Sequence, residues 1–361
     1  MNPTLSSMVM AAAVLSVPLL TASDSADASD RAFRLILATE SGDRESPHGK
    51  AIHRVAALVE DASGGRIRVN EFYQGEIGGP QELFDQLLRG NVDMMLTWPH
   101  TSYDERLSVL HLPYLSTSWE EALSTYGRDG WLTQVADPIF SDMGLHYLGP
   151  FPEGFGGVAT RGSYATTYEQ ARKIKVRSQP IFPLPQTIQA LGFQAVPIDW
   201  SEVYTSIQTG VVDGDSSNVI YWDYVYFGEL LDYFVHTRHN FSFYTFLINQ
   251  QEWDEMDAED RKIISSAVDT VVEEQFASAR AEDEKWIAAA QADGMEYIQP
   301  SDEELANWVE RVRDSVWDEA EDILGEQVMQ EVRSRVTPVG TSDEAAMTAH
   351  RQGLATQEPR L

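Results

Sequence analysis

The chain has 361 residues, of which 43% are hydrophobic, so it can bury a sizeable core as two domains or as one large bilobed unit. It carries 57 acidic residues against 26 lysines and arginines, a formal net charge of −31 at pH 7. A protein with this much negative charge repels nucleic acid and anionic membranes, so we expect neither as a partner. The absence of cysteine excludes disulfides, thiolate metal sites and cysteine nucleophiles.

Arginine supplies most of the positive charge, because only five of the 26 basic residues are lysines. An acidic, lysine-poor surface keeps a protein hydrated when salt screens its self-repulsion, as in halophiles. The composition therefore favours a salt-adapted source, although an ordinary acidic exported protein would share it.

An apolar run over residues 8–20 predicts a targeting segment. It is too short to span a bilayer and has the length of the hydrophobic region of a secretory signal. The first seven residues lack lysine and arginine, which departs from the usual pattern and leaves a buried helix or an uncleaved anchor as the alternative. We expect residues 1–23 to be a signal peptide and the mature protein to be exported to the periplasm without stable membrane insertion.

Strand and helix patterns alternate along the first hundred residues. Short apolar or alternating runs predict strands at 34–38, 66–72 and 92–96, and apolar stripes predict helices at 48–62 and 81–89. Short connections between such elements favour a parallel α/β sheet. Ligands of such sheets bind beyond the carboxyl ends of the strands, which here means the loops at Thr39-Glu40 and Thr97-Trp98.

A second α/β section follows. Strands are predicted at 145–149, 158–160 and 175–177, and helices at 185–191, 202–208, 257–298 and 302–335. The segment 222–246 is unusually aromatic, which predicts buried strands and a helix under a domain interface. The alternative is that a few of these rings line a ligand cleft. The polar residues after Pro338 favour a disordered tail.

Three stretches match a cofactor-binding or metal-binding motif only in part. The glycines of 154–159 match a loose dinucleotide pattern but are not followed by the required helix and acidic residue. The acidic run 213–218 lacks the glycine and glutamate of a calcium loop. His236 and His239 have the spacing of a helical metal pair but no carboxylate placed to complete a site. We therefore expect no cofactor, no metal and no catalytic residues.

Three stretches together resemble a known family, and residues 35–335 are similar to the extracytoplasmic solute receptors of TRAP (tripartite ATP-independent periplasmic) transporters, the DctP-type family. The similarity is carried by 64–69 with 75–78 and 90–94, by 175–177 with Gly192, and by 200–204 running into 208–214. The resemblance implies a small-molecule solute as ligand, delivery to TRAP membrane permease subunits, and no enzymatic chemistry.

The same resemblance implies the fold class, an α/β periplasmic-binding-protein fold with two lobes, a hinge and a long lobe-spanning helix. The expected division places 31–154 plus 243–282 in lobe I, 155–242 plus 283–336 in lobe II, and 337–361 in the tail. An enzyme built on this scaffold and a ligand-sensing receptor domain are the competing classes, but no base and nucleophile pair supports the former.

By similarity, the family's ligand arginine falls on Arg177, whose planar guanidinium suits a carboxylate. The stacking aromatic falls on Trp200, and the orienting asparagine is replaced by Ser217. A second arginine, common in carboxylate binders, is replaced by Gly157. The remaining positions expected to face the cleft are Glu40, Trp98 and Tyr221.

Asp215 stands where the family has a neutral glutamine, and Glu40 adds a second acid. Acids beside aromatic faces suit an ammonium group through ion pairing and cation–π contact. We therefore favour an amine-bearing amino alcohol or zwitterion as the ligand. A mono- or dicarboxylate held by Arg177 is the alternative, and Asp215 would play no part in ligand binding if it only pairs with Arg177 or a turn.

Overall fold

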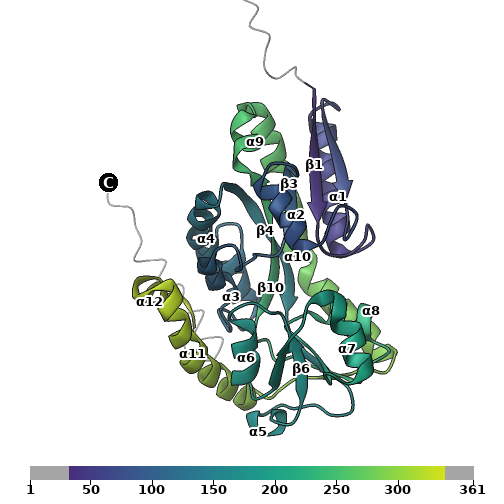
Figure 1. The fold of residues 1–361 in the computed structure, drawn as a ribbon, viewed down its shortest axis with the longest axis vertical. Coiled ribbons are helices and arrows are strands. Elements are labelled where there is room, and N and C mark those ends of the chain that lie inside the picture. Colours follow the sequence, from purple (N-terminus) through teal and green to yellow (C-terminus); the bar gives the residue numbers. More distant parts are fainter. Residues whose placement is uncertain (1–31, 338–361) are drawn as a thin grey trace, which may run out of the picture.

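The computed structural model describes residues 32–337, so the expected signal peptide and nearly all of the expected tail lie outside the described residues. Two β-sheets, each covered by helices, lie at opposite ends of the elongated molecule (Figure 1). We call the part around the first sheet lobe I and the part around the second sheet lobe II. Within 32–337, none of the helices is both long and apolar enough to cross a bilayer.

The lobe I sheet has five strands in the order β2-β1-β3-β10-β4. The first three pair in parallel, as the alternating pattern predicted. β10 is antiparallel to both of its neighbours, so the sheet is mixed, because the chain returns from lobe II to fill the gap between β3 and β4. The strands are β1 (Phe33–Thr39), β2 (Ile67–Phe72), β3 (Met94–Thr97), β4 (Leu145–Phe155) and β10 (Phe241–Asn249).

Both faces of this sheet are buried, which explains the nearly continuous apolar runs of its strands. Leu35 and Leu37 of β1 pack in one hydrophobic cluster with Ile52 and Val268, whereas Ala38 belongs to a second cluster on the opposite face. The covering helices and turns are α1 (Pro47–Ala62), α2 (Pro80–Leu88), η2 (Glu105–His111), α3 (Trp119–Tyr126), α4 (Trp131–Asp142) and α9 (Gln250–Glu255).

The lobe II sheet has six short strands in the order β11-β9-β5-β8-β6-β7. The strands are β5 (Val158–Thr160), β6 (Lys175–Ser178), β7 (Gln194–Pro197), β8 (Gly214–Ser216), β9 (Tyr233–Val235) and β11 (Glu296–Ile298). The helices are α5 (Tyr168–Ala171), α6 (Leu184–Ala190), η3 (Trp200–Glu202), α7 (Val203–Thr209) and α8 (Ile220–Phe227). The aromatic segment 222–246 is thus divided among α8, β9 and β10.

α10 (Ala258–Ala292) joins the two lobes (Figure 1). It packs on β4 and α1 in lobe I and on α8 and β11 in lobe II. The expectation of helix throughout 257–298 was wrong at its end, where β11 pairs with β9. Gly294 adopts a φ of 102°, which a residue with a side chain rarely tolerates, and this conformation turns the chain out of the helix.

The predicted helix at 302–335 is two helices, α11 (Asp302–Leu324) and α12 (Glu326–Arg335), separated at Gly325 with a φ of 81°. Trp308 packs in the lobe II core, whereas Trp317 and Met329 pack in the lobe I core. Assigned by side-chain packing, the last turns of α11 and all of α12 would join lobe I, a different division from the expected one, which kept 283–336 in lobe II.

Candidate functional site

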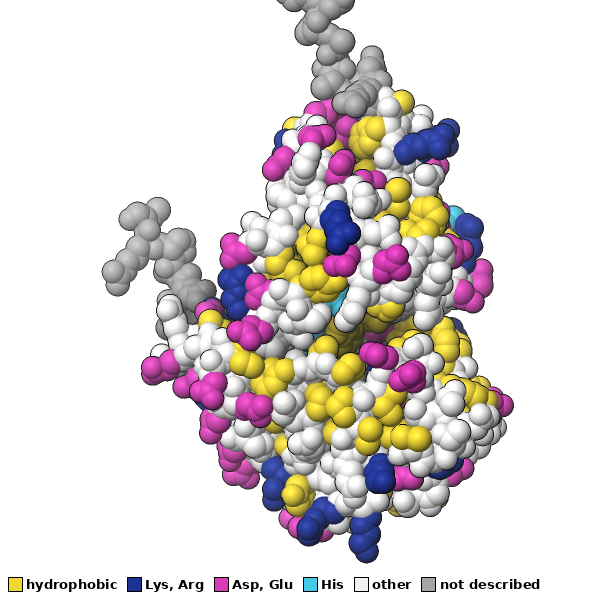
Figure 2. All heavy atoms as spheres, viewed as in Figure 1, with side chains coloured by type: hydrophobic (Ala, Val, Ile, Leu, Met, Phe, Trp, Pro, Cys, Tyr) yellow, Lys and Arg dark blue, Asp and Glu magenta, His cyan; other side chains and the backbone are white. Residues whose placement is uncertain are grey.

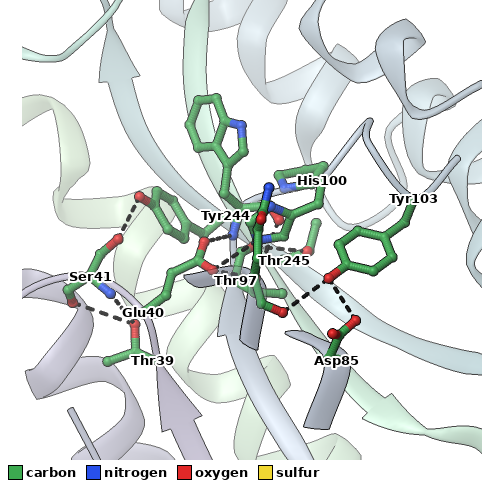
Figure 3. Close-up of polar contacts among 12 residues, drawn as sticks. Thr39, Glu40, Ser41, Asp85, Thr97, His100, Tyr103, Tyr244 and Thr245 are labelled. Carbon is green, nitrogen blue, oxygen red and sulfur yellow. Dashed lines mark hydrogen bonds and ion pairs between the residues drawn. The ribbon is translucent and has the colours of Figure 1, made fainter. Parts of the chain in front are cut away.

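The loops predicted to carry the lobe I side of the site meet at one edge of the sheet. Glu40 follows β1, and its carboxylate accepts hydrogen bonds from the Trp98 amide at 2.7 Å and the Thr97 hydroxyl at 3.1 Å (Figure 3). His100 Nε2 lies 2.9 Å from the same carboxylate. Parallel pairing of β1 with β3 brings these residues together. The result is an acid held in a fixed position and only 6% exposed.

Tyr244 of β10 lies beside Glu40 and is not among the site residues predicted from the sequence. Its hydroxyl lies 2.8 Å from Ser41 Oγ (Figure 3). Its ring meets that of Trp98 edge-on, with centroids 5.4 Å apart. Burial, with smaller contributions from Glu153 and Glu40, raises the pKa of Tyr244 well above its usual value, so the phenol stays neutral. The position therefore offers an aromatic face and a neutral hydroxyl.

The lobe II side is built on two neighbouring strands. Parallel register sets Val176 of β6 opposite Gly214 of β8, so the residues that follow, Arg177 and Asp215, lie side by side. Arg177 Nη1 is 3.3 Å from Asp215 Oδ1, and Arg177 Nε donates to the Ile198 carbonyl at 2.8 Å. Both side chains are buried. Among the described residues, Nη2 has no hydrogen-bond partner, which leaves it for another acceptor.

Asp215 belongs to a larger buried acid cluster. Asn218 Nδ2 donates to Asp215 Oδ2 at 2.8 Å and to Asp223 Oδ1 at 3.1 Å, while Asp223 Oδ2 has no partner among the described residues. Burial raises the pKa of Asp215, and burial together with the charge of Asp215 raises the pKa of Asp223 well above its usual value. The two acids therefore favour a shared single negative charge, which balances Arg177.

Trp200 and Trp222 extend the lobe II side with aromatic surface. The guanidinium of Arg177 lies 5.8 Å from the centre of the Trp200 ring. Trp200 meets Trp222 edge-on at 6.1 Å between centroids, and Tyr221 is half-buried between Trp222 and Trp286 of α10. Trp222 was not among the predicted site residues.

The two remaining predicted positions are more restricted. Ser217 is 1% exposed, has a left-handed φ of 71°, and its hydroxyl lies 2.9 Å from His239 Nε2. A Cβ at Gly157 would lie 2.4 Å from Phe234 Cζ, inside the lobe II core. The structure therefore does not bring a side-chain position at 157 into the cleft, and only its backbone is available there.

A row of rings links the two lobes. His48 of α1 is buried, stacks on Trp222 at 5.3 Å between centroids, and lies 4.0 Å from Tyr244. Figure 2 shows the surface hollowed where the lobes meet, with hydrophobic side chains in the hollow. The site residues described above include one arginine, Arg177, and several carboxyl groups, those of Glu40, Asp215 and Asp223. Within residues 32–337, no group of three or more histidines and acids is arranged to hold a metal ion.

Comparison with known proteins identifies relatives of this chain. Residues 38–322 match the family described as DctP, bacterial extracellular solute-binding protein, family 7. An uncharacterized protein, YiiZ of Salmonella typhimurium, is 27% identical over 72% of this chain and 79% of its own. The ectoine-binding periplasmic protein TeaA of Halomonas elongata is 25% identical over 58% of this chain and 62% of its own. The C4-dicarboxylate-binding protein DctB of Bacillus subtilis is 24% identical over 80% and 82%.

Solved structures show the same fold. The ectoine-binding protein of the Halomonas elongata TeaABC TRAP transporter superposes with a TM-score of 0.77 at 21% identity, covering 84% of this chain and 97% of its own. The sugar acid binding protein DctPAm of Advenella mimigardefordensis, in complex with galactonate, gives 0.77 at 20% identity, with 84% and 98% covered. The two-lobed architecture predicted from the sequence is thus confirmed.

Proposed function

The chain belongs to the DctP family of bacterial extracellular solute-binding proteins, family 7, and we propose that it captures a small amine-bearing solute, an amino alcohol or a zwitterion, for a TRAP membrane permease. Members of this family are periplasmic receptors for small organic solutes that work with membrane permease components, and they are not enzymes.

The observation that carries the proposal is the pairing of Arg177 with Asp215. Because this pair is close to neutral as a unit, Arg177 does not present the uncompensated positive charge that a dicarboxylate requires. The N–H groups of its free Nη2 can still donate to one carboxylate or hydroxyl oxygen of a solute. Glu40, across the cleft, adds a negative charge with no arginine or lysine bonded to it in the described structure.

An ammonium group fits the lobe I side of this arrangement. Glu40 supplies the counter-charge, and the rings of Trp98 and Tyr244 supply faces for cation–π contact. Desolvation inside the cleft strengthens both interactions relative to water. A zwitterion would then bridge the lobes, with its ammonium on Glu40 and its carboxylate on Arg177. Trp200 would stack on the solute, and Ser217 and Tyr221 would contact its edges.

Two relatives support different ligands. The name of TeaA records ectoine binding, and that of DctB records C4-dicarboxylate binding. A mono- or dicarboxylate anchored on Arg177 is therefore the second candidate, and the free Nη2 is the observation that favours it. The two candidates differ in whether Glu40 contributes to affinity.

A thermal-shift screen in about 0.5 M salt, enough to screen the surface charge, tests the proposal. Ligands that bind the native state raise the melting temperature by mass action. Amines, amino alcohols, betaines, amino acids and carboxylates would be compared at equal concentration. Shifts confined to amine-bearing compounds would support the proposal, and shifts confined to plain carboxylates would establish the alternative.

Export and partnership follow from the same proposal. We expect removal of residues 1–23 by a signal peptidase and delivery of the solute to permease subunits in the inner membrane. Amino-terminal sequencing of the secreted protein tests the first expectation. Adjacent genes for two membrane permease subunits would support the second, whereas an adjacent histidine kinase gene would favour a sensing role.

A further inference from the structure

Glu153, near the end of β4, is a buried carboxyl group with no role in the proposed solute contacts. It accepts a hydrogen bond from Trp222 Nε1 at 2.7 Å and a short one from the Ser242 hydroxyl. His48 Nε2 lies 3.3 Å away. Neither ring nitrogen of His48 has a well-formed hydrogen bond in the described structure. The surroundings are otherwise aromatic, since His48 packs on Phe151 as well as on Trp222.

The contact with Trp222 crosses from one lobe to the other. Glu153 and Ser242 lie on β4 and β10 and His48 lies on α1, all in lobe I, whereas Trp222 lies on α8 in lobe II. The edge of Trp222 also approaches lobe I at Gly42, where an added Cβ would lie 3.3 Å from its ring. Trp222 also contacts Trp200, which lies beside Arg177.

We propose that Glu153 is a positioning residue that docks Trp222 onto lobe I and thereby holds Trp200 and Arg177 in place for the solute. The proposal rests on the proposed function, because Trp200 and Arg177 matter only if they bind the solute. Docking requires the carboxyl group to leave water, so its protonation state decides how favourable docking is.

The charge of Glu153 changes close to neutral pH. Burial, opposed by the hydrogen bonds from Ser242 and Trp222, raises the pKa of Glu153 to about 7. The titratable groups that face it do not change charge in this range. Burial lowers the pKa of His48 to about 3, raises that of Tyr221 to about 12 and raises that of Tyr244 well above its usual value.

The sign of the effect follows from this shift. The pKa of an undocked, hydrated Glu153 returns toward its ordinary value of 4.5. The docked state therefore binds an extra proton between that value and about 7. Docking is favoured at low pH and weakens as the pH rises through about 7. We expect the docking equilibrium to fall by roughly tenfold or more between pH 5.5 and pH 8.5.

The first test follows the tryptophan indole N–H signals by ¹⁵N NMR in the ligand-free mature protein. One signal, identified by its loss in Trp222→Phe, should shift with a midpoint near pH 7. The same signal should not titrate in Glu153→Gln, where the amide oxygen still accepts from Trp222. Glu303→Gln, at an exposed acid of α11, is the matched control and should titrate like the wild type. A Trp222 signal without a midpoint near neutral pH would overturn the proposal.

The second test measures lobe separation by small-angle X-ray scattering without solute. The wild type should expand between pH 5.5 and pH 8.5, whereas Glu153→Gln should stay compact at both values and Trp222→Phe should be expanded at both. Equal pH dependence in wild type and Glu153→Gln would contradict the role of Glu153. If Glu153→Gln fails to fold, the proposal is still tested by the pH titration of the wild type and by the expansion of Trp222→Phe. Because neither test uses a solute, a failed ligand screen would refute the proposed function alone.

Discussion

Arg177 and Asp215 form a buried ion pair between adjacent parallel strands of lobe II, with 3.3 Å between Nη1 and Oδ1. Their neighbours Val176 and Gly214 are register partners, so the pair is a direct consequence of how β6 and β8 align. The sequence left open whether Asp215 meets the solute or only pairs with Arg177. The pairing is present, and under the proposed function it would make Asp215 the residue that sets how much positive charge Arg177 offers to a ligand.

Asp215→Asn tests this control of charge. The substitution removes the negative charge but keeps an oxygen that can accept from Ser216 and Arg177. The site then carries one more positive charge, so we expect affinity for a cationic amino alcohol to fall roughly tenfold by repulsion of its ammonium, while affinity for plain carboxylates is kept or improved. Calorimetric titration with one ligand of each class measures the difference. Equal losses for both classes would make Asp215 purely structural.

Glu40→Gln tests the lobe I side. Glutamine keeps an acceptor for the Trp98 amide, so the loop geometry should survive. Affinity for amine-bearing ligands should fall roughly tenfold, because a charge-assisted pair contributes about 1.5–3 kcal/mol, and binding of carboxylates should change little. Glu45→Gln removes a charge 82% exposed on the same lobe and is the matched control. An amine-bearing ligand that binds Glu40→Gln as tightly as the wild type would exclude Glu40 from the site.

The buried acid pair predicts a pH dependence of stability. The pKa of Asp223 in the folded protein is raised well above its usual value, chiefly by burial and by Asp215. A raised pKa contributes stability that is fully present below the ordinary pKa of 3.8 and is lost as pH rises through the folded-state pKa. Asp223→Asn should therefore lose less stability than the wild type as the pH rises from 3.8 toward the raised folded-state pKa.

Denaturant unfolding at several pH values measures this difference. Asp314→Asn, at an exposed position of α11, is the matched control and should follow the wild type. Parallel pH profiles for the wild type and Asp223→Asn would show that Asp223 is not the group responsible.

The surface charge predicts a salt dependence. With a net charge of −31, repulsion among surface carboxylates destabilises the folded state at low ionic strength. The Debye length falls from about 30 Å at 0.01 M to about 3 Å at 1 M salt, so the repulsion is screened over this range. We expect the melting temperature to rise steadily with sodium chloride. A melting temperature that is flat or falls with added salt would argue against a salt-adapted protein.

Local elements were predictable because apolar periodicity is a local property. The strand now bounded as Phe33–Thr39 and the helix Pro47–Ala62 were predicted to within a few residues. The insertion of β10 between β3 and β4 was not, because it pairs segments about 150 residues apart, such as Thr97 with Thr245. No short-range pattern carries that information.

The site residues, too, were predictable where a local pattern places them and not where long-range contacts do. Glu40 and Trp98 were predicted to lie together because both follow parallel strands, and the structure confirms that proximity. Glu153, Trp222 and Tyr244 were missed, since their environments are created by contacts between segments far apart in the sequence, such as the Trp222–Glu153 bond over 69 positions and the Tyr244–Ser41 contact over 203. The aromatic density of 222–246 was the one available signal, and it pointed to the correct region without selecting the residues.

The most direct test of the central claim is calorimetric titration of the wild type, Arg177→Ala and Arg177→Lys with the amine-bearing compound that gives the largest thermal shift. Its isostere with a methyl group in place of the ammonium is titrated in parallel. We expect tight binding of the amine-bearing compound alone, a loss of roughly tenfold or more in Arg177→Ala and partial recovery in Arg177→Lys. Equal binding of the isostere, or unchanged affinity in Arg177→Ala, would contradict it.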